Sequence, residues 1–137
     1  MPDDRFELRP VGHVQSSLVS RAIAPLQGRE GAPEAWLVFN DETATCITDL
    51  HPGDEVLVLT WLHFADRDVR RVHPRGSLHH AEEGVFSTRS PDRPNPIGLH
   101  RVRIVAVESS RIRVRDLEAI DGTPIIDVKP VLSPRER

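Results

Sequence analysis

The sequence predicts a mainly β protein: a small, closed or nearly closed antiparallel β-barrel with one or two short helices. Valine-rich segments alternate apolar and polar residues, turn-forming residues separate these segments, and convincing helical spacing occurs only once. Several antiparallel strands with one short helix are typical of a barrel. The chain has neither a Gly-x-Gly-x-x-Gly turn nor alternating strand and helix units, which argues against a Rossmann-type nucleotide-binding fold.

The expected strands follow one another along the chain. They span residues 11–19, 36–39, 55–64, 99–107, 111–115 and 125–128. The third segment is almost continuously apolar, as in a strand covered on both faces. The fifth has the cleanest alternation, which predicts Ile112 and Val114 inward and three arginines outward. Pro130 ends the last strand because proline has no amide hydrogen to donate.

One helix is expected, over residues 41–50, where apolar residues recur at helical spacing. Asp41 is its candidate N-cap, and His51-Pro-Gly ends it. Cys46 lies inside this segment and is expected to be a small, buried or half-buried side chain. As the single cysteine, it cannot form an internal disulfide.

Length and composition predict one domain over residues 1–137. Its 28% charged and 38% hydrophobic residues are typical of a globular protein with one core. No apolar run approaches the ~20 residues of a membrane helix, and the acidic start resembles no secretory signal. We therefore expect no membrane association and a cytoplasmic location. The net charge of −3 gives no overall positive field for nucleic acid, although a local basic patch is compatible with it.

The most informative segment of the chain is 84–99, which contains three prolines. Each proline fixes its own backbone angle φ and pushes its predecessor towards an extended conformation. The segment therefore cannot be a regular helix or a central strand. Residues 84–88 and the run from Ile97 onwards read as strands on either side of it.

This loop is expected to be stiff and to present Arg89 and Arg93 beside the amide of Asn95. Rigid polar groups held between two strands are a common way to build a binding site. The competing interpretation is a disordered linker or a polyproline ligand for another domain. The position of the loop in mid-chain, flanked by β-type sequence, argues against that alternative.

Four segments together resemble one protein family. They are Phe86-Ser-Thr-Arg-Ser-Pro-Asp-Arg-Pro-Asn-Pro-Ile-Gly-Leu99, Leu117-Glu-Ala-Ile-Asp-Gly-Thr-Pro-Ile-Ile-Asp-Val-Lys-Pro130, Pro10-Val-Gly-His-Val14 and Pro25-Leu-Gln-Gly28. They occur along the chain in the same order as in the TsaA/TrmO-like family and cover nearly the whole chain, and together they are similar to that family. The resemblance implies a β-barrel that forms a homodimer and uses S-adenosyl-L-methionine as its small-molecule methyl donor. It also implies methylation of N6 of a modified adenosine next to the tRNA anticodon.

The resemblance also implies a set of cofactor-binding positions. Carried over residue by residue, they are Pro25, Leu26, Gln27, His63, Phe64, Arg89, Leu99 and, in the 117–123 turn, Leu117, Asp121, Gly122 and Thr123. We add Arg93, because a guanidinium fork suits the cofactor's carboxylate as Arg89 does. Asp121 or Gln27 would accept from the ribose diol, and Gly122 would let the ligand approach closely.

No general base is required, because the leaving group of methyl transfer is already activated by the cofactor and the protein mainly aligns the reactants. Asp127 and Lys129 are the polar candidates nearest the site. A structural ion pair at a strand end explains them equally well. We assign no metal, since the cluster of His73, His79, His80, Glu82 and Glu83 matches no standard zinc spacing. No nucleophile motif supports a hydrolase.

The chain departs from the family at several positions. Gln15-Ser16 replaces an arginine-serine pair, Leu26 replaces an arginine, and Val131 stands where relatives often have tyrosine. We also expect no C-terminal accessory domain of the kind that helps longer relatives to grip tRNA. Cofactor binding is thus better supported than tRNA as substrate, and the alternative is a small-molecule methyltransferase or a non-catalytic cofactor-binding module. Five arginines on adjacent strands are candidates for phosphate contacts or simply the solvated face of a sheet: Arg101, Arg103, Arg111, Arg113 and Arg115.

Overall fold

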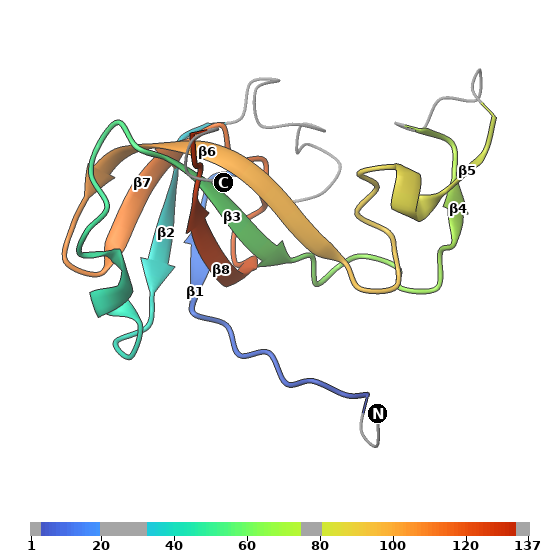
Figure 1. Cartoon of the computed structure of the whole chain (residues 1–137), viewed down its shortest axis with the longest axis horizontal. Coiled ribbons are helices and arrows are strands. Elements are labelled where there is room, and N and C mark those ends of the chain that lie inside the picture. Colours follow the sequence, from blue (N-terminus) through green and yellow to red (C-terminus); the bar gives the residue numbers. More distant parts are fainter. Residues whose placement is uncertain (1–3, 20–32, 75–80, 134–137) are drawn as a thin grey trace.

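The computed structural model describes residues 4–19, 33–74 and 81–133 of the 137-residue chain. Six strands of this part are β1 (Gly12–Gln15), β2 (Ala35–Phe39), β3 (Glu55–Trp61), β6 (Ile97–Val107), β7 (Arg111–Arg115) and β8 (Pro124–Pro130). They close into an antiparallel barrel in the order β1-β2-β7-β6-β3-β8 (Figure 1). The barrel predicted from the sequence is confirmed.

Alternation along the strands fills the barrel interior. On β6 the buried positions include Val102 and Ile104, and on β7 Ile112 and Val114 are fully buried with arginines on the outside, as predicted. On β3 one face is buried and the other is half-buried, so this strand is less covered than its continuous apolar run suggested. The first and third strands are also shorter than predicted, ending at Gln15 and Trp61.

The predicted helix over 41–50 is wrong. The structure has only a short 3-10 turn, Ala44–Ile47, with Thr43 rather than Asp41 at its start. The hydroxyl of Thr43 donates to the carbonyl of Val11 at 2.7 Å, which fixes the turn to the chain before β1. This single turn already buries Ile47, so the burial of Ile47 does not require a longer helix. Cys46 is exposed, contrary to the expectation of a buried side chain.

Between β3 and β6 the described residues 62–74 and 81–96 form a separate lobe outside the barrel, which we call the arm. The amide of Leu62 donates to the carbonyl of Pro96 at 2.8 Å and closes its base. The arm contains a two-stranded sheet of β4 (Arg71–Val72) and β5 (Glu83–Gly84) and lies apart from the barrel (Figure 1). No helix in the described ranges is long and apolar enough to cross a membrane.

Candidate functional site

The proline loop forms the inner part of the arm, and it is ordered by its own side chains. The predicted strand over 84–88 is wrong, since Val85–Ser87 is a 3-10 turn that follows β5 directly. Arg93, which was expected to bind the cofactor, makes bonds within the loop instead of extending from it. Arg93 is half-buried, and its Nη2 donates to the carbonyls of Val85 and Thr88. Its guanidinium therefore folds the loop back on itself rather than extending from it.

A second arginine, which the sequence analysis did not single out, holds the other end of the loop. Arg67 donates from Nε to the carbonyl of Pro94 at 2.7 Å and from Nη2 to Oδ1 of Asn95 at 3.0 Å. Its guanidinium carbon lies 5.1 Å from the ring centre of Trp61, at the end of β3. Arg67 thus fixes the loop to the strand where the arm begins. It is exposed and sits in a polar turn without any motif, so no sequence pattern marks it.

Of the two arginines in the loop, Arg89 is the one whose guanidinium stays available to a ligand. Its side chain is exposed, and no hydrogen bond or ion pair links it to another described residue. The arm also has an apolar groove of about 330 Å³. The groove is lined by Arg70, Gly84, Val85, Phe86, Ser87 and Pro94. Phe86 is 86% exposed at this groove. The arm therefore carries an exposed guanidinium at Arg89 and, lined by other residues of the same lobe, an apolar groove.

His63 and Phe64 lie where the arm leaves the barrel, directly after β3. Both are exposed, and their ring centres are 4.0 Å apart in a tilted arrangement. Leu99 is 44% exposed and, by strand alternation, lies on the outer face of β6 opposite Leu59 of β3. Residues 25–27, the first group of predicted cofactor contacts, lie outside the described residues.

The 117–123 segment crosses the end of the barrel between β7 and β8. The side chains of Leu117 and Thr123 are buried, so only their main-chain groups can reach a ligand. Asp121 and Gly122 are exposed, and Gly122 has a φ of +83°, a conformation that favours glycine. Oδ1 of Asp121 accepts from the amide of Ser16 at 2.9 Å. This bond brings the turn against the chain that leads from β1 towards residue 20.

Two residues that the sequence reasoning missed connect this segment to the base of the arm. Nδ1 of His100 on β6 lies 2.6 Å from Oε1 of Glu118, and Nε2 lies 2.7 Å from Oγ1 of Thr60 on β3. The end of β3, the start of β6 and the 117–123 segment therefore meet at one end of the barrel. Alternation along β6 could have revealed His100, because it shares the inward face with Val102 and Ile104.

Asp127 and Lys129 form an ion pair on β8, with Nζ 2.9 Å from Oδ2. Lys129 pairs with Leu57 and Asp127 with Leu59 in the register of β8 on β3, and both charged side chains are partly exposed. This contact matches the structural alternative considered for them. Among the described residues no group of three or more histidine, cysteine, aspartate or glutamate side chains could hold a metal, while His79 and His80 lie outside that part of the chain.

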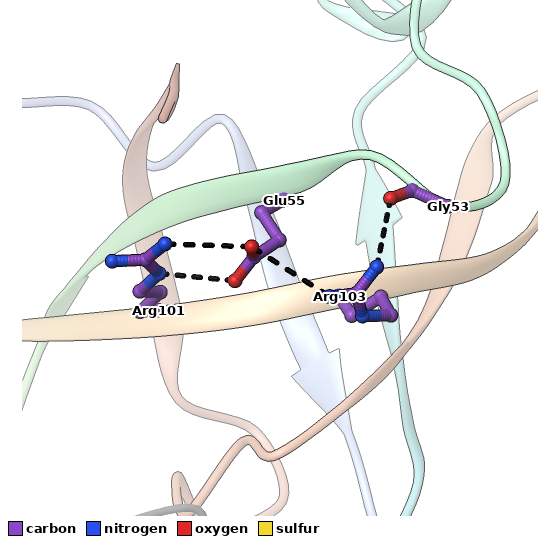
Figure 2. A network of polar contacts seen from close by, with 4 residues as sticks. All are labelled: Gly53, Glu55, Arg101 and Arg103. Atoms are coloured by element: carbon purple, nitrogen blue, oxygen red, sulfur yellow. Dashed lines mark hydrogen bonds and ion pairs between the residues drawn. The ribbon is translucent and has the colours of Figure 1, made fainter. Parts of the chain in front are cut away.

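The five arginines Arg101, Arg103, Arg111, Arg113 and Arg115, which we call the arginine face, share the outer surface of β6 and β7. Each of these arginines has a glutamate partner. Glu55 contacts Arg101 at 3.0 Å and Arg103 at 3.6 Å (Figure 2). The hydrogen bond and the charge of Glu55 raise the pKa of Arg101, which keeps it protonated.

The remaining arginines of this face are paired in the same way. Glu34 lies 2.8 Å from Arg113 and 3.9 Å from Arg115, and Glu108 lies 2.8 Å from Arg111. Arg111 also lies over the ring of Trp36, 3.9 Å from its centre. The arginine face therefore keeps an excess of positive charge, but a smaller one than the arginines alone suggest.

The barrel with its arm and the motif residues around their junction define the class of protein. Residues 13–135 match the family described as the tRNA-methyltransferase O N-terminal domain, and the chain belongs to this TrmO family. The resemblance seen in the sequence is thus confirmed.

Individual relatives cover most of the chain. It is 43% identical over 130 residues to a probable S-adenosyl-L-methionine-binding protein of Methanothermobacter thermautotrophicus, covering 95% of this chain and 93% of that protein. It is 43% identical over 122 residues to an S-adenosyl-L-methionine-binding protein of Archaeoglobus fulgidus, covering 89% and 86%.

Solved structures share the fold. The crystal structure of TrmO from Pseudomonas aeruginosa superposes with a TM-score of 0.73 at 27% identity, and a second TrmO crystal structure gives 0.77 at 26%. Each match covers 93% of this chain. The chain spans only 56% and 58% of the length of those two structures.

Proposed function

We propose that the protein binds S-adenosyl-L-methionine and transfers its methyl group. Membership of the TrmO family over residues 13–135 carries this proposal. Two relatives at 43% identity, which align over nearly their whole length, are named for binding this cofactor, one of them as probable. The composition of the described residues agrees with such a ligand, because the arm carries an exposed guanidinium and apolar surface and the turn before β8 carries an exposed carboxylate.

Several parts of the cofactor have a candidate partner among these residues. The exposed guanidinium of Arg89 suits the carboxylate, since its forked donors match two oxygens. Asp121 uses Oδ1 to accept from Ser16, which leaves its other oxygen for a ribose hydroxyl. A Cβ added to Gly122 would have no atom within 4 Å, so the backbone there is open to close approach. His63, Phe64 and Leu99 add exposed ring and apolar surface.

The chemistry that we assign to the protein is alignment. When bound, the cofactor supplies a methyl group on a positively charged sulfur, which makes the leaving group a good one. The residues of this chain hold the reactants in line and exclude water. Asp127 and Lys129 remain candidates for a catalytic role, although their mutual ion pair supports a structural one.

We further propose tRNA as the methyl acceptor, at N6 of a modified adenosine next to the anticodon. The family description supports this substrate, and the net positive charge of the arginine face suits phosphates. The alternative is a small-molecule methyltransferase or a cofactor-binding module without catalysis. The names of the two relatives, which mention binding only, favour keeping that alternative. A single domain over 1–137 and a cytoplasmic location stay predictions.

We also propose a homodimer that buries an apolar strip on the outer face of β3 and β6. Strand alternation and register place Leu57, Leu59, Trp61, Ile97 and Leu99 together on that face. Ile97 and Leu99 are 41% and 44% exposed, and a contiguous apolar strip of this kind is typical of an interface. Light scattering should give twice the monomer mass for the wild type and the monomer mass for Ile97→Glu. Thr45→Asp, in an exposed turn, serves as the control and should stay dimeric.

A transfer assay tests the activity. Purified protein is mixed with methyl-labelled S-adenosyl-L-methionine and tRNA that lacks the methyl group, and label in tRNA is measured against a no-enzyme blank. Label in the adenosine beside the anticodon supports the proposal. Cofactor binding without label in any tRNA favours the alternative, and the absence of binding rejects both.

A further inference from the structure

Three hydrogen-bonded polar side chains, which we call the buried polar chain, lie at one end of the barrel. Polar groups are not needed there to fill the core. Thr60 is fully buried, His100 is 4% exposed, and Glu118 is 20% exposed at the side chain. The two hydrogen bonds of the imidazole, 2.7 Å to Thr60 and 2.6 Å to Glu118, join β3, β6 and the 117–123 segment. The next inward positions of β6, Val102 and Ile104, are aliphatic.

The chemistry of the groups sets the direction of these bonds. A carboxylate can only accept, so the hydrogen on the imidazole lies on Nδ1 and is donated to Oε1 of Glu118. In the neutral ring Nε2 is then an acceptor, and the hydroxyl of Thr60 donates to it. Thr60 on β3 thus orients the imidazole of His100, and the imidazole in turn orients Glu118 in the 117–123 segment.

Gly98 makes room for this arrangement. A Cβ at Gly98 would lie 2.6 Å from Nε2 of His100 and would also collide with Oγ1 of Thr60. Gly98 belongs to the Pro-Ile-Gly-Leu end of the proline loop, so the motif that carries the family resemblance also accommodates the polar chain. An alanine there would have to displace a buried hydrogen bond.

The segment that Glu118 begins is held on its other side by β1 and the chain after it. The amide of Asp121 donates to the carbonyl of Leu18 at 2.6 Å, and that of Gly122 donates to the carbonyl of Val14 at 2.7 Å. At Glu118 the segment is held by a side chain of β6, the strand that continues the proline loop. His100 is therefore the one polar link, among the described contacts, between β6 and this turn.

We infer that His100 is a positioning residue, which acts through Glu118 to set the place of the 118–123 turn against the base of the arm. The inference rests on the proposed cofactor site, because Asp121 and Gly122 belong to that turn. His100 itself is buried, with 4% of its surface exposed. Its effect on cofactor affinity is indirect, through the position of the exposed carboxylate of Asp121 and of the backbone at Gly122.

Two substitutions of His100 test the roles of Nδ1 and Nε2 separately. In His100→Asn the side-chain amide lies near the place of Nδ1 and can still donate to Glu118. In His100→Gln the amide reaches the place of Nε2 instead, and the bond to Glu118 is lost. Val102→Ala is the matched control, since it weakens the same inward face of β6 without touching Glu118 or Thr60.

Calorimetric titration with S-adenosyl-L-methionine and amide hydrogen exchange of the ligand-free proteins are the two measurements. We expect His100→Gln to raise the dissociation constant about tenfold or more and to speed exchange over 118–123, while His100→Asn stays within about threefold of the wild type. Val102→Ala should lower the melting temperature with little change in affinity.

Two results would overturn the inference. One is wild-type affinity and exchange in His100→Gln, and the other is an equal loss of affinity in Val102→Ala, which would mean that general stability is responsible. If the wild-type protein itself binds no S-adenosyl-L-methionine, the proposed function fails instead. The exchange comparison, made without ligand, then still decides whether His100 holds the turn.

Discussion

Nη2 of Arg67 donates a hydrogen bond to Oδ1 of Asn95 over 3.0 Å, joining the start of the arm to the end of its proline loop. The same arginine binds the carbonyl of Pro94 and lies over Trp61. Three contacts from one side chain make Arg67 a link between the loop and β3, in addition to the bond from the amide of Asp66 to Asp92. The prolines stiffen the loop locally, and these contacts hold it against the start of the arm.

We predict that Arg67→Ala weakens cofactor binding without unfolding the barrel. Arg67 is exposed, so the loss should be about 1 kcal/mol, or about a fivefold rise in the dissociation constant. Titration calorimetry measures this. Arg71→Ala is the control, because the bonds of the Arg71 side chain go to Glu82 in the β4–β5 sheet and not to Pro94 or Asn95. Equal effects of both substitutions would contradict the role given to Arg67.

Arg93→Lys should loosen the loop. A lysine has one ammonium group and cannot keep the geometry of a guanidinium that donates to the carbonyls of both Val85 and Thr88. We expect amide exchange over 84–96 to increase while exchange in β6 and β7 stays as in the wild type. If exchange in the loop is unchanged, Arg93 does not order it.

Gly98→Ala should destabilise the fold by about 1–3 kcal/mol, the usual cost of overpacking a core. The added methyl group would meet Oγ1 of Thr60 and, 3.1 Å away, Cδ2 of Leu62. Urea unfolding followed by fluorescence gives the free energy of unfolding. Gly84→Ala is the control, since nothing lies within 4 Å of a Cβ there. A Gly98→Ala protein as stable as Gly84→Ala would mean that the buried polar chain is not tightly packed.

Substitution in the arginine face tests its role in binding tRNA. Arg103→Ala should lower tRNA affinity a few-fold and reduce the slope of log K against log salt by about 1, the signature of one lost phosphate contact. Cofactor affinity should not change. Filter binding over a salt series measures the slope. An unchanged slope would mean that the arginine face is only solvated and paired with Glu55, as Figure 2 shows for Arg103.

The barrel was predictable because alternation reports directly on burial. Arg111–Arg115 is the clearest case, since its two aliphatic residues could face only the core. The helix over 41–50 failed for a related reason. Apolar spacing shows that a face can be buried, and here Ile47 is buried in the core and Leu50 packs against it after only one 3-10 turn, so their burial does not require a longer helix.

Sequence motifs singled out candidate site residues but not the contacts that hold them in place. The motifs drew attention to the proline loop and to Asp121-Gly122, which bonds to Ser16 beside β1. They could not tell Arg89 from Arg93, because which guanidinium folds back depends on carbonyls that only the folded loop brings close. Arg67 and Glu118 were missed for the same reason, since their partners are distant in sequence.

The central claim is that this domain binds S-adenosyl-L-methionine through a free guanidinium on an ordered loop. Calorimetric titration of the wild type, Arg89→Ala and Arg71→Ala with this cofactor tests it most directly. We expect saturable binding by the wild type and Arg71→Ala, with a dissociation constant about tenfold or more higher for Arg89→Ala at an unchanged melting temperature. No heat of binding in the wild type, or equal affinity in Arg89→Ala, would contradict the claim.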